Sequence, residues 1–319
     1  MVETRFTRLV GCSIPIQQAP MGPISPPGLA LAVAAAGGLG TLHALHPAAE
    51  VEAACGSLPE ETSGALALNV LIPLFDRPTL ELAARRCRVI DFFWGPPDPE
   101  LVELAHQGGA LAGWQVGSIE SARAAVGAGC DLVTAQGVEA GGHHDGRSAL
   151  MPLLEACLQE LDVPVLGAGG IGGTEDVERV MAAGADGVRV GTRFIATEES
   201  GAHPRYQQAL ITAQAEDAVE TDRFSIDCPL CPSHHGVLRG SIHAAELRKG
   251  QVIARLGANK ILAFAGIPPL AQVEGEPEAM CMYAGRGVAA IRAVQPAAAV
   301  VAELAEGTAR ASNRGAARQ

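Results

Sequence analysis

The sequence contains Gln136-Gly-Val-Glu-Ala-Gly-Gly-His143, Gly167-Ala-Gly-Gly-Ile-Gly172 and Val190-Gly-Thr-Arg-Phe194, three glycine-rich stretches that each follow a short apolar run. Apolar runs of this length, bounded by glycine, are typical of buried strands. The second and third stretches can present clustered backbone N–H groups, which are suited to holding a phosphate. They therefore predict turns at one end of a sheet, with an anion bound between them.

Working outward, short apolar runs alternate with Ala-rich helical stretches, and many helices end on glycine just before the next strand. Helices begin at plausible caps such as Ser118 and Thr174. Eight strands joined by short right-handed crossovers predict an α/β fold, a (β/α)8 TIM barrel. The predicted strands cover residues 14–18, 39–42, 65–69, 89–93, 110–116, 132–136, 164–168 and 187–190.

The pattern changes after residue 200. Residues 201–282 mix polar helical segments with Pro-containing loops and show no strand periodicity, which indicates a small, mainly helical cap that carries part of the substrate site. An Ala/Val-rich amphipathic helix then returns at residues 285–306. The predicted organisation is a cofactor-binding barrel over residues 1–200, the cap over 201–282, and a C-terminal barrel helix with a polar tail over 283–319.

Bulk composition excludes several classes of function. The chain has 319 residues and a net charge of −12, and it has no basic stripe that could cover a nucleic-acid backbone. No long uncharged apolar run and no basic-then-apolar leader is present, so we expect a soluble, cytoplasmic protein without membrane contact. The eight cysteines are scattered along the chain, several within apolar patterns, which favours reduced thiols.

The glycine motif admits two other interpretations. Gly167, Gly169 and Gly172 satisfy the G-x-G-x-x-G pattern of a Rossmann dinucleotide site, although Asp186 precedes the next strand instead of ending it. The glycines could also serve only to allow tight turns. The barrel interpretation is favoured because the loops after strands seven and eight of a TIM barrel commonly bind a phosphate together. Arg189 is a further candidate to neutralise that phosphate.

A series of motifs then resembles, in order and spacing, the nitronate monooxygenase family, formerly called 2-nitropropane dioxygenases. The resemblance covers nearly the whole chain and implies an FMN enzyme on a TIM barrel with a small second domain. Such enzymes oxidise alkyl nitronates, and in some members nitroalkanes, to carbonyl compounds and nitrite with O2. Besides the three opening stretches, the motifs are Gln17-Gln-Ala-Pro-Met-Gly22, Ala35-Ala-Gly-Gly-Leu-Gly40, Asn69-Val70, Gly184-Ala-Asp-Gly-Val188 and Ala284-Gly-Arg-Gly-Val288.

The resemblance also implies roles for individual residues. His143 matches the catalytic base, since an imidazole can remove a carbon proton next to a nitro group near neutral pH. The turn Pro20-Met21-Gly22 matches the segment that meets the isoalloxazine ring. The remaining residues implied to contact FMN are Asn69, Gln136, Gly141 and Gly142 beside the ring, and Gly169, Gly170, Val190, Gly191 and Thr192 around the phosphate.

Nearby residues offer alternatives that we expect to be minor. His144 could compete with His143, but neighbours on one loop point in different directions, and Glu139 is better suited to stabilising a turn. The segment Cys228-Pro-Leu-Cys231-Pro-Ser-His234-His235 resembles a zinc knuckle, yet a single CxxC with histidines packed within eight residues would need strained geometry. No metal site is therefore predicted, and this segment is expected to be a cap loop facing the substrate.

Function remains open among three classes. The first is a nitronate-oxidising FMN monooxygenase that acts on a small nitronate or nitroalkane and O2. The second is an NAD(P)H-dependent FMN reductase of the enoyl-ACP reductase II or NADH:quinone reductase type, because those branches share Glu-Ala-Gly-Gly-His. The third is a non-catalytic barrel that binds a flavin or another ligand. Neither the physiological substrate nor the oligomeric state follows from the sequence, and a homodimer stays open.

Overall fold

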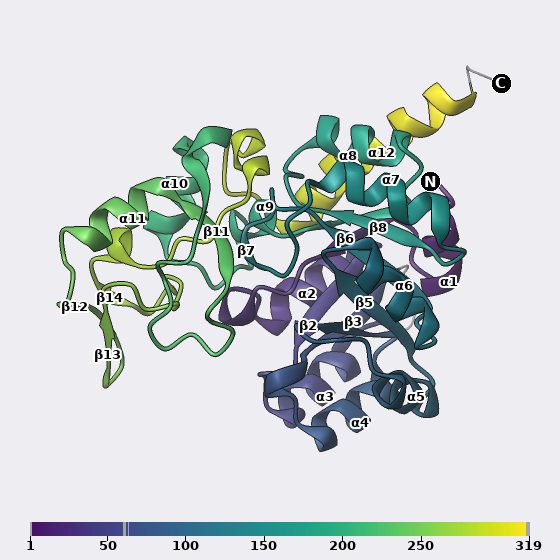
Figure 1. The fold of residues 1–319 in the computed structure, drawn as a ribbon, viewed down its shortest axis with the longest axis horizontal. Helices are drawn as coiled ribbons and strands as arrows, with labels where there is room; N and C mark the ends of the chain where they lie inside the picture. Colours follow the sequence, from purple (N-terminus) through teal and green to yellow (C-terminus); the bar gives the residue numbers. More distant parts are fainter. Residues whose placement is uncertain (1, 60–61, 63, 317–319) are drawn as a thin grey trace.

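The computed structural model describes residues 2–59, 62 and 64–316. Eight parallel strands close into a barrel in the order β1-β2-β3-β4-β5-β6-β8-β9, and β9 pairs back onto β1 through Arg189 and Gln17 (Figure 1). Each of the eight barrel strands overlaps a predicted strand, so the TIM barrel is confirmed. The strands are β1 (Ile16–Gln18), β2 (Leu39–His43), β3 (Ala65–Leu71), β4 (Val89–Phe93), β5 (Leu111–Val116), β6 (Leu132–Gln136), β8 (Val165–Ala168) and β9 (Gly187–Val190).

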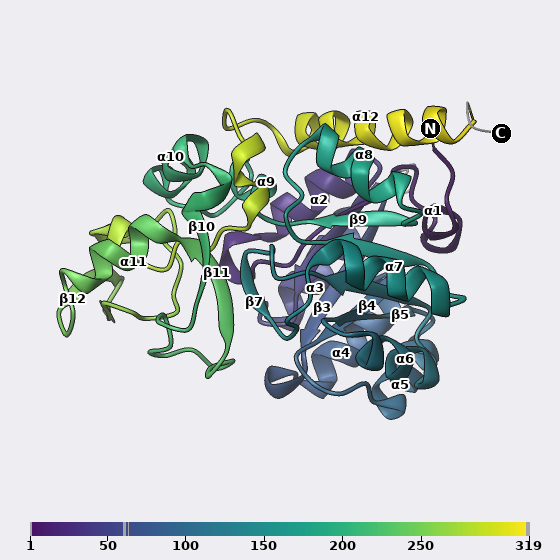
Figure 2. The same cartoon turned by 45° about the horizontal axis from the view of Figure 1, so that its top comes forward.

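Helices surround the barrel, and their apolar faces form one core with the outer faces of the strands. Local sequence sets their limits: α5 begins where the Asp98 side chain accepts a hydrogen bond from the Glu100 N–H, and it ends at Gly109, whose φ is 90°. The last helix, α12, lies beside α8 and α2 (Figure 2). The outer helices are α2 (Pro27–Ala35), α3 (Ala48–Ser57), α4 (Arg77–Arg86), α5 (Pro99–Gly108), α6 (Ile119–Gly127), α7 (Leu150–Glu160), α8 (Thr174–Ala182) and α12 (Ala297–Ala316).

The amino end of the barrel is closed by helix α1 (Arg5–Val10). Phe6 and Val10 of this helix are buried against the first residues of several strands, among them Leu39 and Val89. This plug makes the carboxyl end of the strands the open end. Active sites of TIM barrels lie at that end, so the closure is consistent with the position of the predicted turns.

After the short helix α9 (Thr192–Ile195) the chain leaves the barrel and builds a second unit around its own apolar core. It holds two α-helices, α10 (Pro204–Thr212) and α11 (Arg239–Glu246), and five strands, so the expectation of a mainly helical cap is corrected. The strands are two to five residues long, too short for an alternating pattern to be visible in the sequence. They are β10 (Ala218–Thr221), β11 (His234–Leu238), β12 (Val252–Leu256), β13 (Asn259–Leu262) and β14 (Glu274–Gly275).

The cap is joined to the barrel by β7 (Gly142–His144), a strand in the loop after β6. It pairs with β11, giving a three-stranded sheet in the order β10-β11-β7, whereas β12 lies between β13 and β14 in a separate sheet. The loop that carries His143 is therefore part of a cap sheet. Turns of 3-10 helix complete the structure: η1 (Gly22–Ile24), η2 (Ile72–Leu74), η3 (Ala215–Asp217), η4 (Pro277–Ala279) and η5 (Arg286–Ala290).

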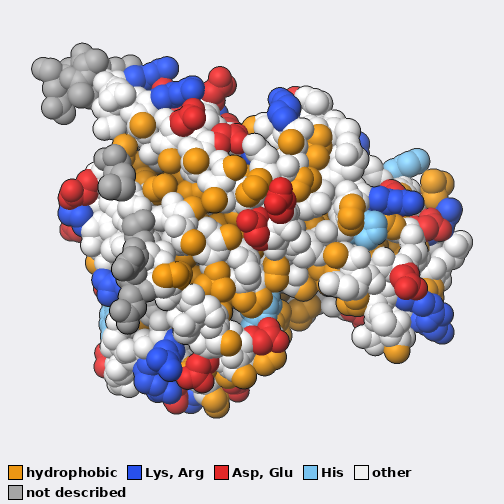
Figure 3. Space-filling model, turned by 180° about the vertical axis from the view of Figure 1, so that it is seen from behind, with side chains coloured by type: hydrophobic (Ala, Val, Ile, Leu, Met, Phe, Trp, Pro, Cys, Tyr) orange, Lys and Arg blue, Asp and Glu red, His pale blue; other side chains and the backbone are white. Residues whose placement is uncertain are grey.

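The surface is mixed in character. On the face seen from behind, Lys and Arg side chains are scattered among acidic and apolar groups, without a continuous basic stripe in the part that the structure describes (Figure 3). Among the described residues, no helix has both the length and the hydropathy needed to traverse a bilayer.

Candidate functional site

A cleft of about 300 Å³ lies at the carboxyl end of the barrel, bounded by the strand ends on one side and by cap residues on the other. Its volume is at the lower end of the range of small-molecule and cofactor pockets. Of the predicted site residues, only Val190 is not part of its lining, because the Val190 side chain is buried within β9. The predicted residues that line the cleft are Pro20, Met21, Gly22, Asn69, Gln136, Gly141, Gly142, His143, Gly169, Gly170, Gly191 and Thr192.

The two predicted phosphate turns lie at one rim of this cleft. Gly169 and Gly170 have φ values of 108° and 68°, a backbone conformation that favours glycine. A Cβ on Gly191 would lie 3.7 Å from the Met21 sulfur, so the Gly191–Thr192 turn adjoins the turn at residues 20–22. The segments that the sequence predicts to hold a phosphate and a ring are thus neighbours.

The backbone N–H groups at the start of helix α8 already have a hydrogen-bond partner. Asp176 Oδ2 accepts hydrogen bonds from the N–H groups of Gly172 and Gly173, at 3.0 and 3.3 Å. These amides are therefore occupied by a carboxylate that caps the helix. An anion at this rim would depend on the turns at Gly169–Gly170 and Gly191–Thr192 instead of on the positive end of α8.

His143 is placed in the cleft by the pairing of β7 with β11. It lies opposite His235 in the register, and His144 lies opposite His234. Because successive side chains of a strand point to opposite faces, His143 lines the cleft while His144 turns toward Glu220, whose Oε2 is 3.6 Å from the His144 Nε2. Of the two adjacent imidazoles, the structure brings His143 to the cleft.

Burial determines the protonation of this imidazole. Desolvation, together with smaller contributions from the neighbouring His235 and His144, lowers the pKa of His143 to about 4. Desolvation is also the main cause that lowers the pKa of His235 to about 4. His143 is therefore neutral at neutral pH and has a nitrogen lone pair available to accept a proton.

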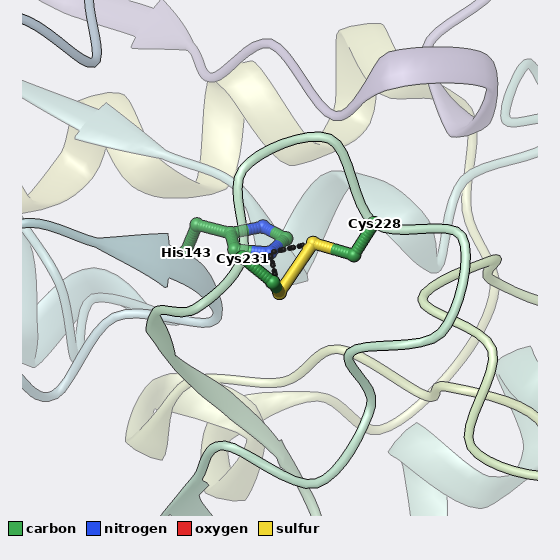
Figure 4. Close-up of side chains that lie close together, drawn as sticks. All are labelled: His143, Cys228 and Cys231. Atoms are coloured by element: carbon green, nitrogen blue, oxygen red, sulfur yellow. Dashed lines mark hydrogen bonds between the residues drawn. A yellow bond between two sulfur atoms is a disulfide. The ribbon is translucent and has the colours of Figure 1, made fainter.

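A disulfide between Cys228 and Cys231 lies against His143 (Figure 4). The His143 Nε2 is 3.3 Å from the Cys228 sulfur and 3.8 Å from the Cys231 sulfur. The expectation of reduced thiols is corrected for this pair. The imidazole that meets the two sulfurs belongs to His143 of β7, and not to His234 or His235 of the segment that carries the cysteines. Cys228 lines the cleft, which agrees with the predicted cap loop.

The floor of the cleft contains a charged network that the sequence does not reveal. Arg189 points into the barrel, where its guanidinium donates to Asp91, to Gln115 Oε1 at 2.6 Å and to Gln17 Oε1 at 3.1 Å. The Arg189 and Asp91 side chains are 1% and 0% exposed. The Asn69 amide also donates to Asp91 Oδ2, at 3.1 Å. The expected pairing of Arg189 with a phosphate is thus replaced by a buried ion pair beneath the cleft.

A second histidine, His43, lines the cleft at the end of β2. Neither ring nitrogen has a hydrogen-bond partner within the described part of the chain, and the ring stacks on His46 at a centroid distance of 3.7 Å. Burial, together with His46, lowers the pKa of His43 to about 3. The sequence indicates only a packing or surface role for His43, because nothing in its spacing marks it as part of a site. His43, His143 and His235, whose pKa values are lowered to between about 3 and about 4, are referred to below as the low-pKa histidines.

Comparison with known proteins agrees with this geometry. The model of a family described as nitronate monooxygenase matches residues 75–307. The chain belongs to the nitronate monooxygenase family. That match extends from the segment before α4 to within α12, so it covers the barrel strands from β4 to β9 and the cap. The chain is accordingly an oxidoreductase.

The proteins that this chain resembles are named for different activities. It is 31% identical to nitronate monooxygenase from Pseudomonas aeruginosa, over 65% of this chain and 73% of that one. It is 29% identical to (3aS,4S,5R,7aS)-5-hydroxy-7a-methyl-1-oxo-octahydro-1H-indene-4-carboxyl-CoA dehydrogenase from Rhodococcus jostii, over 83% and 75%. Among solved structures, nitroalkane oxidase from Streptomyces ansochromogenes is similar at a TM-score of 0.72 and 27% identity, over 98% and 99%.

Proposed function

We propose that this protein binds FMN in the cleft and oxidises alkyl nitronates with O2 to carbonyl compounds and nitrite. We further propose that it accepts neutral nitroalkanes after removing a carbon proton. Family membership and the 27% identical nitroalkane oxidase support this class of substrate. A cleft of about 300 Å³ is of the size that takes small molecules.

The residues of the cleft fit FMN. Within its described lining, Arg189 is the only side chain with a permanent charge, and its charge is balanced by Asp91. A phosphate would therefore be held mainly by backbone N–H groups of the Gly169–Gly170 and Gly191–Thr192 turns, which glycine leaves open to close approach. When bound, FMN supplies the acceptor for the two electrons of the oxidation.

The observation that carries the proposal is the half-buried, neutral imidazole of His143 next to the glycine wall of the cleft. A Cβ on Gly141 would meet the Gly285 nitrogen at 2.6 Å, whereas one on Gly142 would meet nothing within 4 Å. Gly141 thus packs tightly behind the wall, and Gly142 leaves space in front of it. His143 is held by the β7–β11 pairing, and the Gln136 amide donates to its carbonyl oxygen at 3.3 Å.

For a neutral nitroalkane, we propose that His143 accepts the carbon proton. The nitronate needs no base, because it has already lost that proton, so there His143 positions the anion. A substrate carbon would approach the imidazole beside Cys228, which lies on the Nε2 side of the ring at 3.3 Å. General-base catalysis contributes about 10²- to 10⁴-fold to a rate.

The test compares H143Q with H144Q on 2-nitropropane and on propyl-2-nitronate. We expect H143Q to retain FMN and to lose about 10²- to 10⁴-fold on the nitroalkane, with a much smaller loss on the nitronate. H144Q is the matched control, because that imidazole faces Glu220 and not the cleft. Equal losses on both substrates in H143Q would argue against a base, and a wild-type flavin that propyl-2-nitronate leaves oxidised under anaerobic conditions would refute the proposed reaction.

A second candidate is a flavin reductase or dehydrogenase of thioester substrates. The Rhodococcus jostii relative, named as a carboxyl-CoA dehydrogenase, favours this candidate because it is similar over 83% of this chain. Rapid anaerobic bleaching of the flavin by NADH or NADPH, with no bleaching by propyl-2-nitronate, would select the reductase. Bleaching by the nitronate alone would select the monooxygenase.

A further inference from the structure

The cysteine pair of the cap is the feature that the proposed oxidation leaves unexplained. Cys228 and Cys231 lie in the loop between β10 and β11, with their Cα atoms 5.5 Å apart, which is within the range of disulfides. The loop brings Cys228 into the lining of the cleft and brings both sulfurs to His143. Figure 4 shows the imidazole of His143, which belongs to β7, facing the sulfur bridge.

This pair reaches both the cleft and the surface. Cys228 lines the cleft, whereas the residues around the pair, Asp227, Pro229 and Pro232, are exposed. The two cysteines themselves are half-buried. A thiol reagent or an external dithiol could thus approach the bridge from outside, while a molecule bound in the cleft meets it from inside. A disulfide that only stabilised the fold would not need to be reachable from the surface or from the cleft.

The neighbouring imidazole is suited to thiol chemistry. Low-pKa, reactive cysteines are typically found in Cys-x-x-Cys motifs or next to histidine, and both features occur here. The His143 Nε2 lies closer to Cys228 than to Cys231, so a proton can pass between the ring and the Cys228 sulfur. His143 thus contacts both the cleft and one sulfur of the pair.

We propose that the Cys228–Cys231 disulfide is a second redox centre of the cleft, which accepts an electron pair from reduced flavin while His143 delivers a proton to Cys228. The inference rests on the proposed binding of flavin. The S–S bond takes up two electrons and breaks, and the dihydroflavin is oxidised. The two protons released by the dihydroflavin end on the two sulfurs, one of them through His143, so that the products are oxidised flavin and two thiols.

The same three residues could instead bind a metal ion, because their donor atoms lie within 4.8 Å of one another. Zinc requires thiolates, and the sulfurs of this structure are joined in a disulfide. The geometry therefore favours the redox centre over the metal site. Metal content is nevertheless an outcome of the test.

The test is an anaerobic dithionite titration of the air-oxidised, FMN-loaded wild type, C231S and C55S, followed by flavin absorbance. We expect the wild type to consume twice as much reductant per flavin as C231S, since two electrons reduce the flavin and two reduce the disulfide. C55S is the matched control, because it removes one sulfur of the other close pair, in which the Cys55 and Cys87 sulfurs are 3.5 Å apart and outside the cleft lining. It should titrate like the wild type.

A second measurement does not depend on flavin. Alkylation and peptide mapping should find Cys228 and Cys231 blocked before reduction and both labelled after it. Equal reductant consumption by the wild type and C231S, free thiols at both positions in air-oxidised enzyme, or stoichiometric zinc would each overturn the inference. A preparation that cannot be loaded with FMN would refute the proposed function and, because the electron donor is then missing, this inference with it. Mapping would still show whether the disulfide forms.

Discussion

The protonation of His143 makes a quantitative prediction about pH. Burial lowers its pKa to about 4, compared with an ordinary value of 6.5. A difference of about 2.5 pKa units corresponds to about 3 kcal/mol in favour of the neutral ring. At about pH 5.5, an imidazole with the ordinary pKa is about nine-tenths protonated, whereas His143 is still more than nine-tenths neutral. The proton acceptor proposed here therefore survives mild acid.

The assay measures initial nitrite release from 2-nitropropane between about pH 8 and pH 5.5, with brief exposure to each pH. Freshly added propyl-2-nitronate serves at each pH as the control for folding and for the flavin step. We predict that the nitroalkane rate, divided by the nitronate rate, changes by less than about a factor of two across this range. A fall of about tenfold with a midpoint near pH 6.5 would refute the argument that burial keeps His143 neutral.

Three further predictions concern stability. The folded pKa values of the low-pKa histidines lie below the unfolded value, so the unfolded state binds more protons in acid. The free energy of unfolding should therefore fall as pH drops from about 6.5 toward 4, by up to about 4 kcal/mol per pH unit if all three contribute. Urea unfolding that is flat over this range would contradict this prediction. D91N leaves the buried Arg189 charge without its carboxylate and should lower the free energy of unfolding by about 3–5 kcal/mol. A loss below about 1 kcal/mol would show that the hydrogen bonds from Arg189 to Gln17 and Gln115 are enough to stabilise the buried charge. G141A forces a Cβ to within 2.6 Å of a backbone nitrogen and should cost about 1–3 kcal/mol in thermal or urea unfolding, whereas the control G127A meets nothing within 4 Å and should be neutral or stabilising.

The barrel could be predicted from the sequence because its strands are short apolar runs bounded by glycine. Residues 89–93 are an example: this mainly apolar run, followed by Gly95, predicts a strand, and it forms β4 with all five residues buried. The cap could not be predicted in the same way. β13 reads Asn259-Lys260-Ile261-Leu262, with one buried side chain, so its strand character depends on pairing with β12 and not on its own pattern.

The candidate site was predictable where chemistry follows from local sequence and not where it follows from tertiary contacts. The glycine turns and His143 are local motifs, and the structure places them around one cleft. The pairing of Arg189 with Asp91 joins strands 98 residues apart, so no spacing rule reveals it. The contact of His143 with Cys228 spans 85 residues and depends on the pairing of β7 with β11.

The most direct test of the account is the affinity of the apoprotein for FMN and for riboflavin, which differ by the phosphate. Two charge-assisted hydrogen bonds from the glycine turns are worth about 1.5–3 kcal/mol each, which predicts that FMN binds about 10²- to 10⁴-fold more tightly. Fluorescence quenching during titration gives both dissociation constants. Equal affinities, or no binding of either flavin, would contradict the claim that the turns at Gly169–Gly170 and Gly191–Thr192 hold a flavin phosphate.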